Sequence, residues 1–329
     1  MSDARLTLAG VLEAPAGHGT LVSVGMGPDG PAAVWSSSSG AADILGRQST
    51  PDGASYAATR TATSPSAVLV RHAADGSILP EVTVVDRFPV AHPLVQPMPD
   101  GGYLIVGARC RWSDGTPEQN AIVYSRDGVV ERTGTLGDGV EHLQVDDDGR
   151  IWAGYADEGV LGAFGWNGPG PLPLGAPGVV RWSPTFDKQW EFPSDDVWID
   201  ACYALNVSGD TVLACPYADF PVLRIRQGEV EVGTTSAEGP NGIVAAGDTV
   251  GLIGSYDEPG SVLVGRLTDG QLESPRTWSL TMPDGSPVPP VRVTCRGSVA
   301  HFFVGTAWLR FTLTGGPPSG PRPVRSPQV

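Results

Sequence analysis

Cysteine, histidine and charged side chains are all scarce in this chain of 329 residues. Charged residues make up 17% and hydrophobic residues 40%, so enough apolar side chains are present to fill a core, and a globally disordered chain is excluded. The four cysteines form no CxxC pair and no zinc-like spacing. Cys202 and Cys215 flank the turn at Ser208 and Gly209, and we expect them to be free, buried thiols.

Long hydrophobic runs and an excess of basic residues are also missing. No apolar stretch approaches the roughly 18 residues of a membrane-spanning helix, and the N-terminal residues MSDARLTLAG lack the basic start and apolar run of a secretory signal. The formal net charge is −15, which repels phosphate backbones and anionic membranes, although it also serves plain solubility. These features predict a cytoplasmic protein that binds neither nucleic acid nor membrane and accepts a neutral or cationic ligand more easily than an anionic one.

Sequence motifs that would name a reaction are absent as well. The chain has no G-x-S-x-G, no phosphate-binding loop, no H-E-x-x-H and no calcium loop. Helical periodicity is almost absent too. The reaction or ligand therefore cannot be read from a motif.

Short apolar or alternating runs, each closed by a turn pair, fill the chain instead. The 44 glycines and 31 prolines are spread along it without a collagen period, as expected for many tight turns. Asp and Gly tolerate the positive φ that tight hairpins require. One series of turns starts at Asp29, Asp100, Asp148, Gly209, Gly247 and Gly297, and a second, interleaved series at Asp75, Asp127, Asp187, Gln227 and Asp269.

Divided at these turns, the chain repeats as units of four strands. One unit reads HLQVDDDGRIWAGYADEG followed by GVVRWSPTFDKQWEF; the last, VRVTCRGSVAHFFVGTAWLRFTL, supplies only three strands, and the leading ARLTLAGVLEA can supply the missing outer one. A single unit cannot bury both faces of its sheet, so the units must pack against one another. We predict an all-β chain that forms a six-bladed β-propeller, with the N-terminal strand completing the last blade.

Two further boundaries follow from the same division. Seven blades remain possible, because the spacer between Ser36 and Ser66 could hold a degenerate pair of strands. Residues 1–314 are expected to form a single propeller domain. Residues 315–329 (GGPPSGPRPVRSPQV) are rich in Pro and Gly, lack a hydrophobic period, and are expected to be disordered.

The stretch VDDDGRIWAGYADEGV, in the third unit, carries the pattern DG-x-IW-x-G. It resembles blades of the NHL, virginiamycin B lyase-like and sensor-regulator propellers. The close resemblance is confined to this unit, and elsewhere only the rhythm of the turns matches. It implies a β-propeller fold and no active site, and the metal-ligand pattern of the gluconolactonase-like enzymes is not found.

The connections on one face of the predicted disc are much longer than those on the other. In a four-stranded blade (strands A to D), the tight A–B and C–D turns share one face, and the B–C and D–A connections share the other. The long connections run over residues 36–66, 111–120, 158–179 and 284–289. Long loops on a rigid scaffold commonly carry function, so we interpret this face as the binding face.

Three B strands end in nearly the same way, at Tyr155/Asp157, Tyr217/Asp219 and Tyr256/Asp257. In consecutive blades these residues would form one arc around the channel mouth. Such an acidic, aromatic rim suits a cationic or sugar-like ligand. The alternative is structural: the tyrosine covers the blade edge and the aspartate begins the next turn.

His18, His92 and His142 fall before or at the start of the innermost strand of the first three blades, where they would line the channel entrance. They could bind a divalent metal that activates a water, or His92 and His142 could act as acid and base without a metal. The alternative is that they are loop or core histidines bonded to backbone, as we expect for His72 and His301. Comparable positions of the other blades hold Asp200, Tyr203, Asn241 and Arg292.

Arg109, Arg111 and Trp112 end a B strand across the predicted mouth from the acidic arc. An arginine there could orient a ligand carboxylate, or it could pair with carboxylates of the rim. The insertion at residues 158–178 is apolar, is flanked by glycines and carries Trp166, so it is either a lid or a static cover.

These observations favour a propeller that binds a small polar or cationic molecule at the channel mouth. Tyr155, Asp157, Tyr217, Asp219, Tyr256, Asp257, Arg109 and Asp200 are the predicted ligand-binding residues. If the site is catalytic, lyase, isomerase or hydrolase chemistry fits it best, with His92 and His142 as the catalytic pair. The alternative is a protein-interaction scaffold without chemistry, which would show a flat face rather than a deep mouth.

Overall fold

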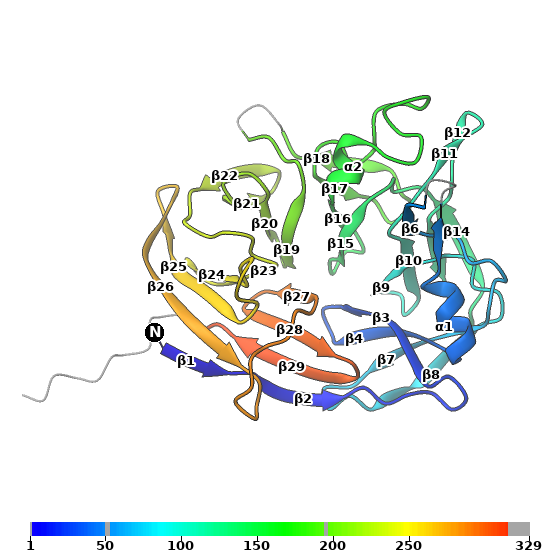
Figure 1. Ribbon diagram of the computed structural model, residues 1–329, viewed down its shortest axis with the longest axis horizontal. Helices are drawn as coiled ribbons and strands as arrows, with labels where there is room; N and C mark the ends of the chain where they lie inside the picture. Colours follow the sequence, from blue (N-terminus) through cyan, green and yellow to red (C-terminus); the bar gives the residue numbers. More distant parts are fainter. Residues whose placement is uncertain (1, 50–52, 194–196, 315–329) are drawn as a thin grey trace, which may run out of the picture.

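The computed structural model describes residues 2–49, 53–193 and 197–314, and its regular structure is almost entirely β (Figure 1). The predicted disordered tail, residues 315–329, lies outside the described residues. Two short helices occur in the described ranges, α1 (Ser38–Ile44) and α2 (Asp157–Leu161). In the part of the chain described, no helix has the length and apolar character needed to cross a membrane. The cytoplasmic location stays a prediction.

Antiparallel pairing joins the strands into groups of four in the order of the chain, and we number these groups as sheets. One parallel bridge, between Asn206 and Cys295, links the fourth and sixth groups into a single eight-stranded sheet. The first sheet holds β3 (Thr20–Met26), β4 (Pro31–Ser36), β7 (Ala67–His72) and β8 (Ile78–Val85). The second holds β9 (Pro93–Pro97), β10 (Tyr103–Gly107), β13 (Ala121–Tyr124) and β14 (Val130–Gly134). The third holds β15 (Val140–Val145), β16 (Ile151–Tyr155), β17 (Val179–Trp182) and β18 (Lys188–Glu191).

The remaining groups follow the same order. The fourth sheet holds β19 (Cys202–Ser208), β20 (Thr211–Pro216), β21 (Val222–Arg226) and β22 (Glu229–Gly233). The fifth holds β23 (Gly242–Ala246), β24 (Thr249–Ile253), β25 (Ser261–Thr268) and β26 (Gln271–Thr281). The sixth holds β27 (Val293–Arg296), β28 (Val299–Val304), β29 (Ala307–Thr312) and β2 (Thr7–Val11).

The sheets stand radially around a central axis, with β3, β9, β15, β19, β23 and β27 innermost (Figure 1). This arrangement confirms the predicted β-propeller. Buried apolar side chains gather between neighbouring sheets rather than in one central core. One cluster, for example, joins Leu104 and Val123 of the second sheet to Ile151 and Trp182 of the third. Middle strands such as β16 are therefore buried on both faces, whereas the residues of the outer strand β14 are exposed or half-buried.

The N-terminal segment completes the sixth sheet as predicted. Strand β2 pairs antiparallel with β29, Thr7 lying opposite Arg310. Just before it, β1 (Ser2–Arg5) pairs in parallel with β26 of the fifth sheet, which the sequence did not predict. The N-terminal segment thus ties two neighbouring sheets together.

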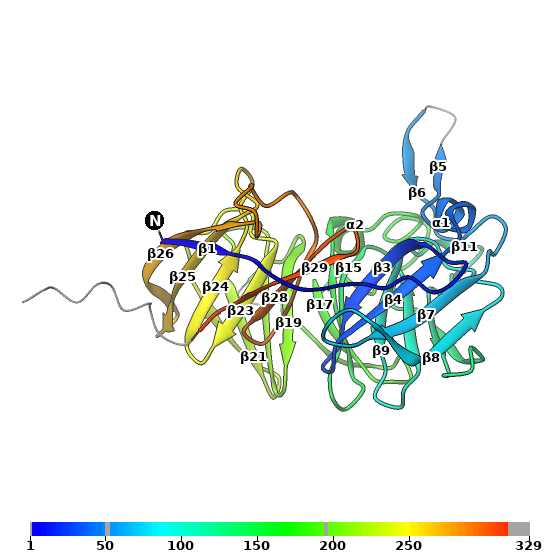
Figure 2. The same cartoon turned by 90° about the horizontal axis from the view of Figure 1, so that it is seen from below.

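The spacer between Ser36 and Ser66 forms α1 and a separate hairpin of β5 (Arg47–Ser49) and β6 (Ser55–Ala57). This hairpin projects from one face of the disc (Figure 2). A second small hairpin, β11 (Trp112–Ser113) with β12 (Thr116–Pro117), follows β10. Both are two-stranded sheets of their own.

Four polar side chains of the inner strands hydrogen-bond across the axis; we call Gln96, Gln144, Asn206 and Arg296 the axial network. Gln144 of β15 donates to the carbonyls of Leu205 (3.1 Å) and Cys295 (2.9 Å), and its Oε1 accepts from the Val207 N–H (2.8 Å). One side chain therefore bridges the third, fourth and sixth sheets.

The other members extend this network to every inner strand. Gln96 of β9 accepts from the Val145 N–H (3.3 Å). Asn206 of β19 donates to the Ile243 carbonyl on β23 (2.8 Å). Arg296 of β27 donates to the carbonyls of Met26 on β3, Val145 on β15 and Val207 on β19, at 3.2, 3.0 and 3.3 Å in that order.

Close approach of β3 to β9 requires a glycine at position 25. A Cβ on Gly25 would collide with the Val95 carbonyl oxygen. The inner strands are thus held together by polar contacts and tight backbone packing.

Replacing Gln144 with leucine is expected to destabilise the fold by about 3 kcal/mol, because the Val207 N–H and two carbonyls lose their partner in a buried site. Urea unfolding followed by tryptophan fluorescence measures this. Gln271→Leu, at an exposed position of β26, is the matched control and should change stability by less than about 0.5 kcal/mol. Equal stabilities of the two variants would contradict the role given to the axial network.

Acid should destabilise the fold partly through His301. Burial, followed by the charges of Arg310 and Arg296, lowers the pKa of His301 to about 3, and its Nδ1 accepts a hydrogen bond from Trp308 (3.1 Å). A lowered folded-state pKa means that the unfolded state takes up the proton first, so stability is lost as the pH falls from about 6.5 toward 3.

In His301→Gln, the slope of unfolding free energy against pH between 6 and 4 should be shallower than in the wild type, by up to about 1.4 kcal/mol per pH unit. Urea titrations at several pH values test this. Parallel curves for the two proteins would refute the assignment.

Candidate functional site

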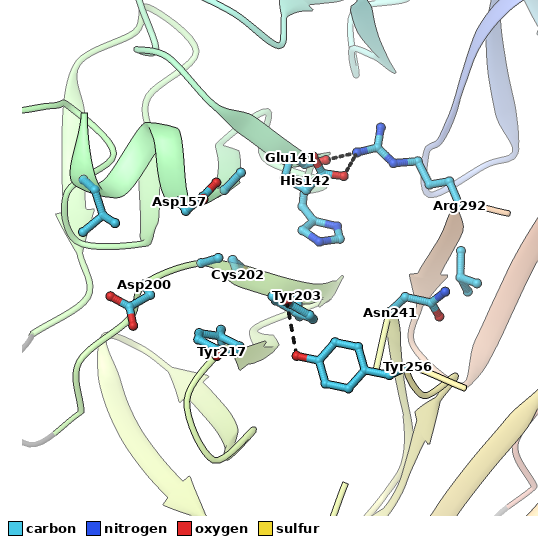
Figure 3. Close-up of a pocket in the computed structure, with 14 residues that line it drawn as sticks. Glu141, His142, Asp157, Asp200, Cys202, Tyr203, Tyr217, Asn241, Tyr256 and Arg292 are labelled. Carbon is cyan, nitrogen blue, oxygen red and sulfur yellow. Dashed lines mark hydrogen bonds and ion pairs between the residues drawn. The ribbon is translucent and has the colours of Figure 1, made fainter. Parts of the chain in front are cut away.

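A cavity of about 780 Å³ opens at the channel mouth, between the third, fourth, fifth and sixth sheets (Figure 3). Its walls come from the ends of B strands and the starts of A strands, which is the juxtaposition predicted for this face. It is lined by Glu141, His142, Ala156, Asp157, Leu161, Asp200, Ala201, Cys202, Tyr203, Tyr217, Asn241, Tyr256, Arg292 and Val293.

Aromatic rings form one wall of this cavity. Tyr203 stacks on Tyr217 with ring centroids 5.7 Å apart and meets Tyr256 edge-on at 6.4 Å. Phe220 lies behind all three, 5.4 to 5.9 Å from each, and is buried. We call these four residues the aromatic cluster. The Tyr256 hydroxyl donates to the Tyr203 hydroxyl at 3.5 Å, a contact that raises the pKa of Tyr256 to about 12 and keeps it neutral.

Carboxylates stand around the rings. Asp157 begins α2 directly after β16, and Asp200 precedes β19, where its Oδ1 accepts from the Trp198 indole N–H (2.6 Å). Glu141 lies opposite on β15 (Figure 3). The cavity therefore combines aromatic faces with negative charge.

Glu141 and Arg292 pair across the mouth. Arg292 Nη2 lies 2.6 Å from Glu141 Oε1 and also contacts the Glu141 carbonyl oxygen. Partial burial by itself would raise the pKa of Glu141, but the neighbouring Arg292 cation outweighs it, and the pKa is lowered. The cation of Arg292 is thus already neutralised within the protein.

The His142 ring points into the cavity (Figure 3). Burial lowers its pKa to about 4, against the opposing effect of Glu141 and with the repulsion of Arg292 in support. Part of the side chain reaches the cavity surface, and protein surrounds the ring on its other sides. His142 is therefore a neutral imidazole at neutral pH.

β-Bulges place Glu141 and Tyr203 in the mouth. In β15 the register shifts between Val140 and His142, leaving Glu141 as the extra residue, and in β19 it shifts between Cys202 and Ala204, leaving Tyr203. A bulge re-aims one side chain without breaking the rest of the strand. The side chains of Glu141 and Tyr203 therefore no longer follow the alternation of the strand between its two faces.

Only part of the predicted Tyr/Asp arc reaches the cavity. Tyr217, Tyr256 and Asp157 line it, as does Asp200, whereas Asp219 and Asp257 are exposed outside the lining. The prediction for Tyr155 was wrong: its side chain is fully buried, and its hydroxyl donates to the Leu136 carbonyl (2.7 Å).

The insertion at residues 158–178 explains the burial of Tyr155. A Cβ on Gly175 would collide with the Tyr155 ring, so the segment packs directly on it. Trp166 is buried and donates from its indole N–H to the Cys110 carbonyl (2.8 Å). The contacts of this insertion are those of a static cover.

Arg109 does not face the cavity. Its guanidinium holds Asp138 through two hydrogen bonds of 2.8 and 2.9 Å, contacts Glu158 at 3.1 Å, and lies over the Phe164 ring. Asp138 is fully buried and also accepts from the Cys110 N–H. Arg109 therefore pairs with nearby carboxylates, which was the alternative to its orienting a ligand.

The three histidines of the proposed metal set are not brought together. His142 lines the main cavity, His92 lines a neighbouring one, and His18 lies in neither lining, its Nδ1 near the Ala16 carbonyl (3.2 Å). Across residues 2–49, 53–193 and 197–314, no three His, Cys, Asp or Glu side chains are grouped to hold a metal ion. The proposed His92 and His142 pair is likewise divided between two cavities.

All four cysteines are buried and free. The bulge in β19 places Cys202 opposite Pro216 rather than opposite Cys215. Burial raises the pKa of Cys202, which borders the cavity, to about 12, so its thiol stays protonated. The predicted free thiols are confirmed.

Sequence reasoning missed Glu141 and Phe220. Glu141 directly precedes a histidine that was singled out, but the bulge that turns it into the mouth leaves no pattern in the sequence. Phe220 follows the PYAD stretch, and its buried apolar ring could have been assigned as support for Tyr217.

Removing Arg292 should raise the pKa of His142. In Arg292→Met the repelling cation is lost and Glu141 is freed to attract the imidazolium, so the imidazole should titrate above the present value of about 4. Histidine ring NMR across pH 3–8, assigned with His142→Gln, measures the change. A pKa that falls or stays constant would contradict this electrostatic arrangement.

Comparison with known proteins adds a fold likeness and no family. No protein-family model matches the chain, and no curated protein matches it. Similar solved structures include the calcium-binding protein regucalcin from Agrobacterium tumefaciens (13% identity, 94% of this chain and 95% of that chain, TM-score 0.46). BamB from Moraxella catarrhalis is similar at 12% identity, over 88% of this chain and 84% of that chain (TM-score 0.43).

Hsv2 from Kluyveromyces lactis is similar at 10% identity, over 86% of this chain and 71% of that chain, with a TM-score of 0.44. All three are β-propeller-type structures. At TM-scores this low the likeness says nothing about ligand or activity, and the fold assignment rests on the sheet arrangement itself.

Proposed function

We propose that this protein is a six-bladed β-propeller that binds a small organic cation, such as a quaternary ammonium, at its channel mouth. The observation that carries the proposal is the aromatic cluster standing beside carboxylates in one cavity of about 780 Å³. The blade count is supported by the grouping of strands in fours, with β2 added to the last group.

The tyrosines supply ring faces to a cation. Tyr217 and Tyr256 are 42% and 60% exposed, and both border the cavity together with Tyr203. An aromatic face attracts a positive charge by about 0.5–2 kcal/mol, more when the site is desolvated. Rings that meet edge-on, as Tyr203 and Tyr256 do, form two walls of one corner.

The charges of the cavity favour the same ligand. Asp157 and Asp200 border it, and within the described ranges neither forms an ion pair with a lysine or arginine. Glu141 neutralises Arg292, the one arginine of the lining. The overall charge of −15 also attracts cations from solution.

His142 adds a polar group to such a site. Its imidazole is neutral at neutral pH and faces the cavity, so its unprotonated nitrogen can accept a hydrogen bond from a hydroxyl or amine of a bound ligand. This role does not require His92. The alternative of a protein-interaction scaffold is less well supported, because aromatic and acidic side chains line a cavity at the mouth rather than a flat apolar face.

The test is binding of choline, with the neutral isostere 3,3-dimethylbutan-1-ol as the ligand control, by isothermal titration calorimetry at low salt. Choline should bind more tightly than the alcohol. Tyr203→Leu should weaken choline by about 10-fold through the lost ring face, and Asp200→Asn by a few-fold through the lost charge.

Matched variants separate the site from the rest of the surface. Two control variants change residues outside the cavity lining: Tyr56→Leu on β6, and Asp219→Asn in the loop after β20. Both should leave choline affinity unchanged. Equal affinity for choline and its neutral isostere would refute the proposal, as would equal losses in site and control variants.

A further inference from the structure

Two ends of the cavity at the channel mouth suit a positive group in different ways. Figure 3 shows Asp157 and Asp200 at one end and Tyr256 at the other. Two rings connect the ends, since Tyr203 stacks on Tyr217 at 5.7 Å and meets Tyr256 edge-on at 6.4 Å. A ligand that spans this cavity of about 780 Å³ therefore meets carboxylates at one end and ring faces at the other.

The aspartate end favours an ammonium group that carries hydrogen atoms. Within the described ranges neither Asp157 nor Asp200 forms an ion pair with a lysine or arginine. Carboxylates bind the N–H donors of cations through short, charge-assisted hydrogen bonds. A primary ammonium has three such donors, as a lysine side chain does, whereas a quaternary ammonium has none. The aspartates are therefore better satisfied by a protonated amine.

The tyrosine end suits a second positive group. The rings of Tyr203 and Tyr256 form two walls of one corner, and the ring faces attract a cation. The His142 ring points into the same cavity, and the backbone of Cys202 and Tyr203 lies beside it. Because burial lowers the pKa of His142 to about 4, an unprotonated ring nitrogen can accept a hydrogen bond from an N–H group.

The charges of the lining favour a ligand with two positive charges. Glu141 and Arg292 neutralise each other, with Arg292 Nη2 lying 2.6 Å from Glu141 Oε1. The negative charges of Asp157 and Asp200 are left uncompensated. A monocation balances one of these carboxylates, whereas a dication balances both. The Glu141–Arg292 pair stays intact in this arrangement, so the ligand does not meet an uncompensated arginine.

We propose that the ligand is a linear diammonium compound, whose ends carry N–H donors and whose chain is aliphatic. One ammonium group lies at Asp157 and Asp200, the aliphatic chain lies along the rings of Tyr217 and Tyr203, and the second ammonium group lies in the corner at Tyr256, where His142 accepts a hydrogen bond. This inference rests on the proposed function, because it names the class of cation that the same cavity binds.

The experiment compares three ligands by isothermal titration calorimetry with the wild-type protein at low salt. Butane-1,4-diamine carries both ammonium groups, pentan-1-amine replaces the second by a methyl group, and 4-aminobutan-1-ol replaces it by a hydroxyl. The diamine should bind about 10-fold more tightly than either monocation. Its affinity should also fall more steeply with added salt, because two charges are screened instead of one.

Variants place the two ends. Tyr256→Leu removes a ring face from the second ammonium group, so it should abolish most of the advantage of the diamine and change the affinity for pentan-1-amine little. Asp157→Asn should weaken all three ligands by a similar factor, because each places an ammonium group there. Tyr256 is 60% exposed and Asp157 is also exposed, so neither change threatens folding. Tyr56→Leu and Asp219→Asn, outside the cavity lining, are the matched controls and should behave as the wild type.

The outcomes separate the two proposals. If choline binds but the diamine binds no more tightly than pentan-1-amine, the diammonium ligand is wrong and the cation site stands. If the diamine is preferred by the same factor in Tyr256→Leu as in the wild type, its second charge lies elsewhere on the acidic surface, and the inference is overturned as well. If neither choline nor any of the amines binds, the proposed function fails and this inference fails with it.

Discussion

Hydrogen bonds across the central axis are the constraint on which the rest of the structure depends. Apolar clusters join each sheet to its neighbours, whereas polar side chains reach beyond the adjacent sheet. Gln144 bridges three sheets, and Arg296 reaches from the sixth sheet to the first, third and fourth. Because these groups are buried, each lost partner leaves an unsatisfied donor or acceptor. The network thereby fixes the inner strands whose ends form the mouth.

Bulges at the starts of the inner strands convert this rigid frame into a site. Val22, Glu141 and Tyr203 are each the extra residue of a bulge in β3, β15 and β19. Because a bulge interrupts the alternation of the strand at each of them, they supply an apolar side chain, a carboxylate and an aromatic ring to the mouth. The strands beyond the bulges remain paired, so the site gains its chemistry without loosening the sheets.

The exposed Glu141–Arg292 ion pair determines the balance of charge at the mouth. By neutralising its one arginine, the pair leaves Asp157 and Asp200 to determine the charge of the first cavity. The pair also borders a neighbouring cavity of about 490 Å³. The proposed preference of the first cavity for a cation follows from this placement.

The turn pairs and alternating runs determined the β class, the strand order and the N-terminal strand of the sixth sheet, because these depend on local backbone chemistry and a period of two. Tertiary structure alone decided which of the similar strand endings became part of the cavity. Tyr155, Tyr217 and Tyr256 end B strands in much the same way, yet the insertion at residues 158–178 packs over Tyr155, while the other two tyrosines remain exposed. The positions of Glu141 and Tyr203 were decided in the same way, since a bulge depends on how two strands pair and on what packs around them.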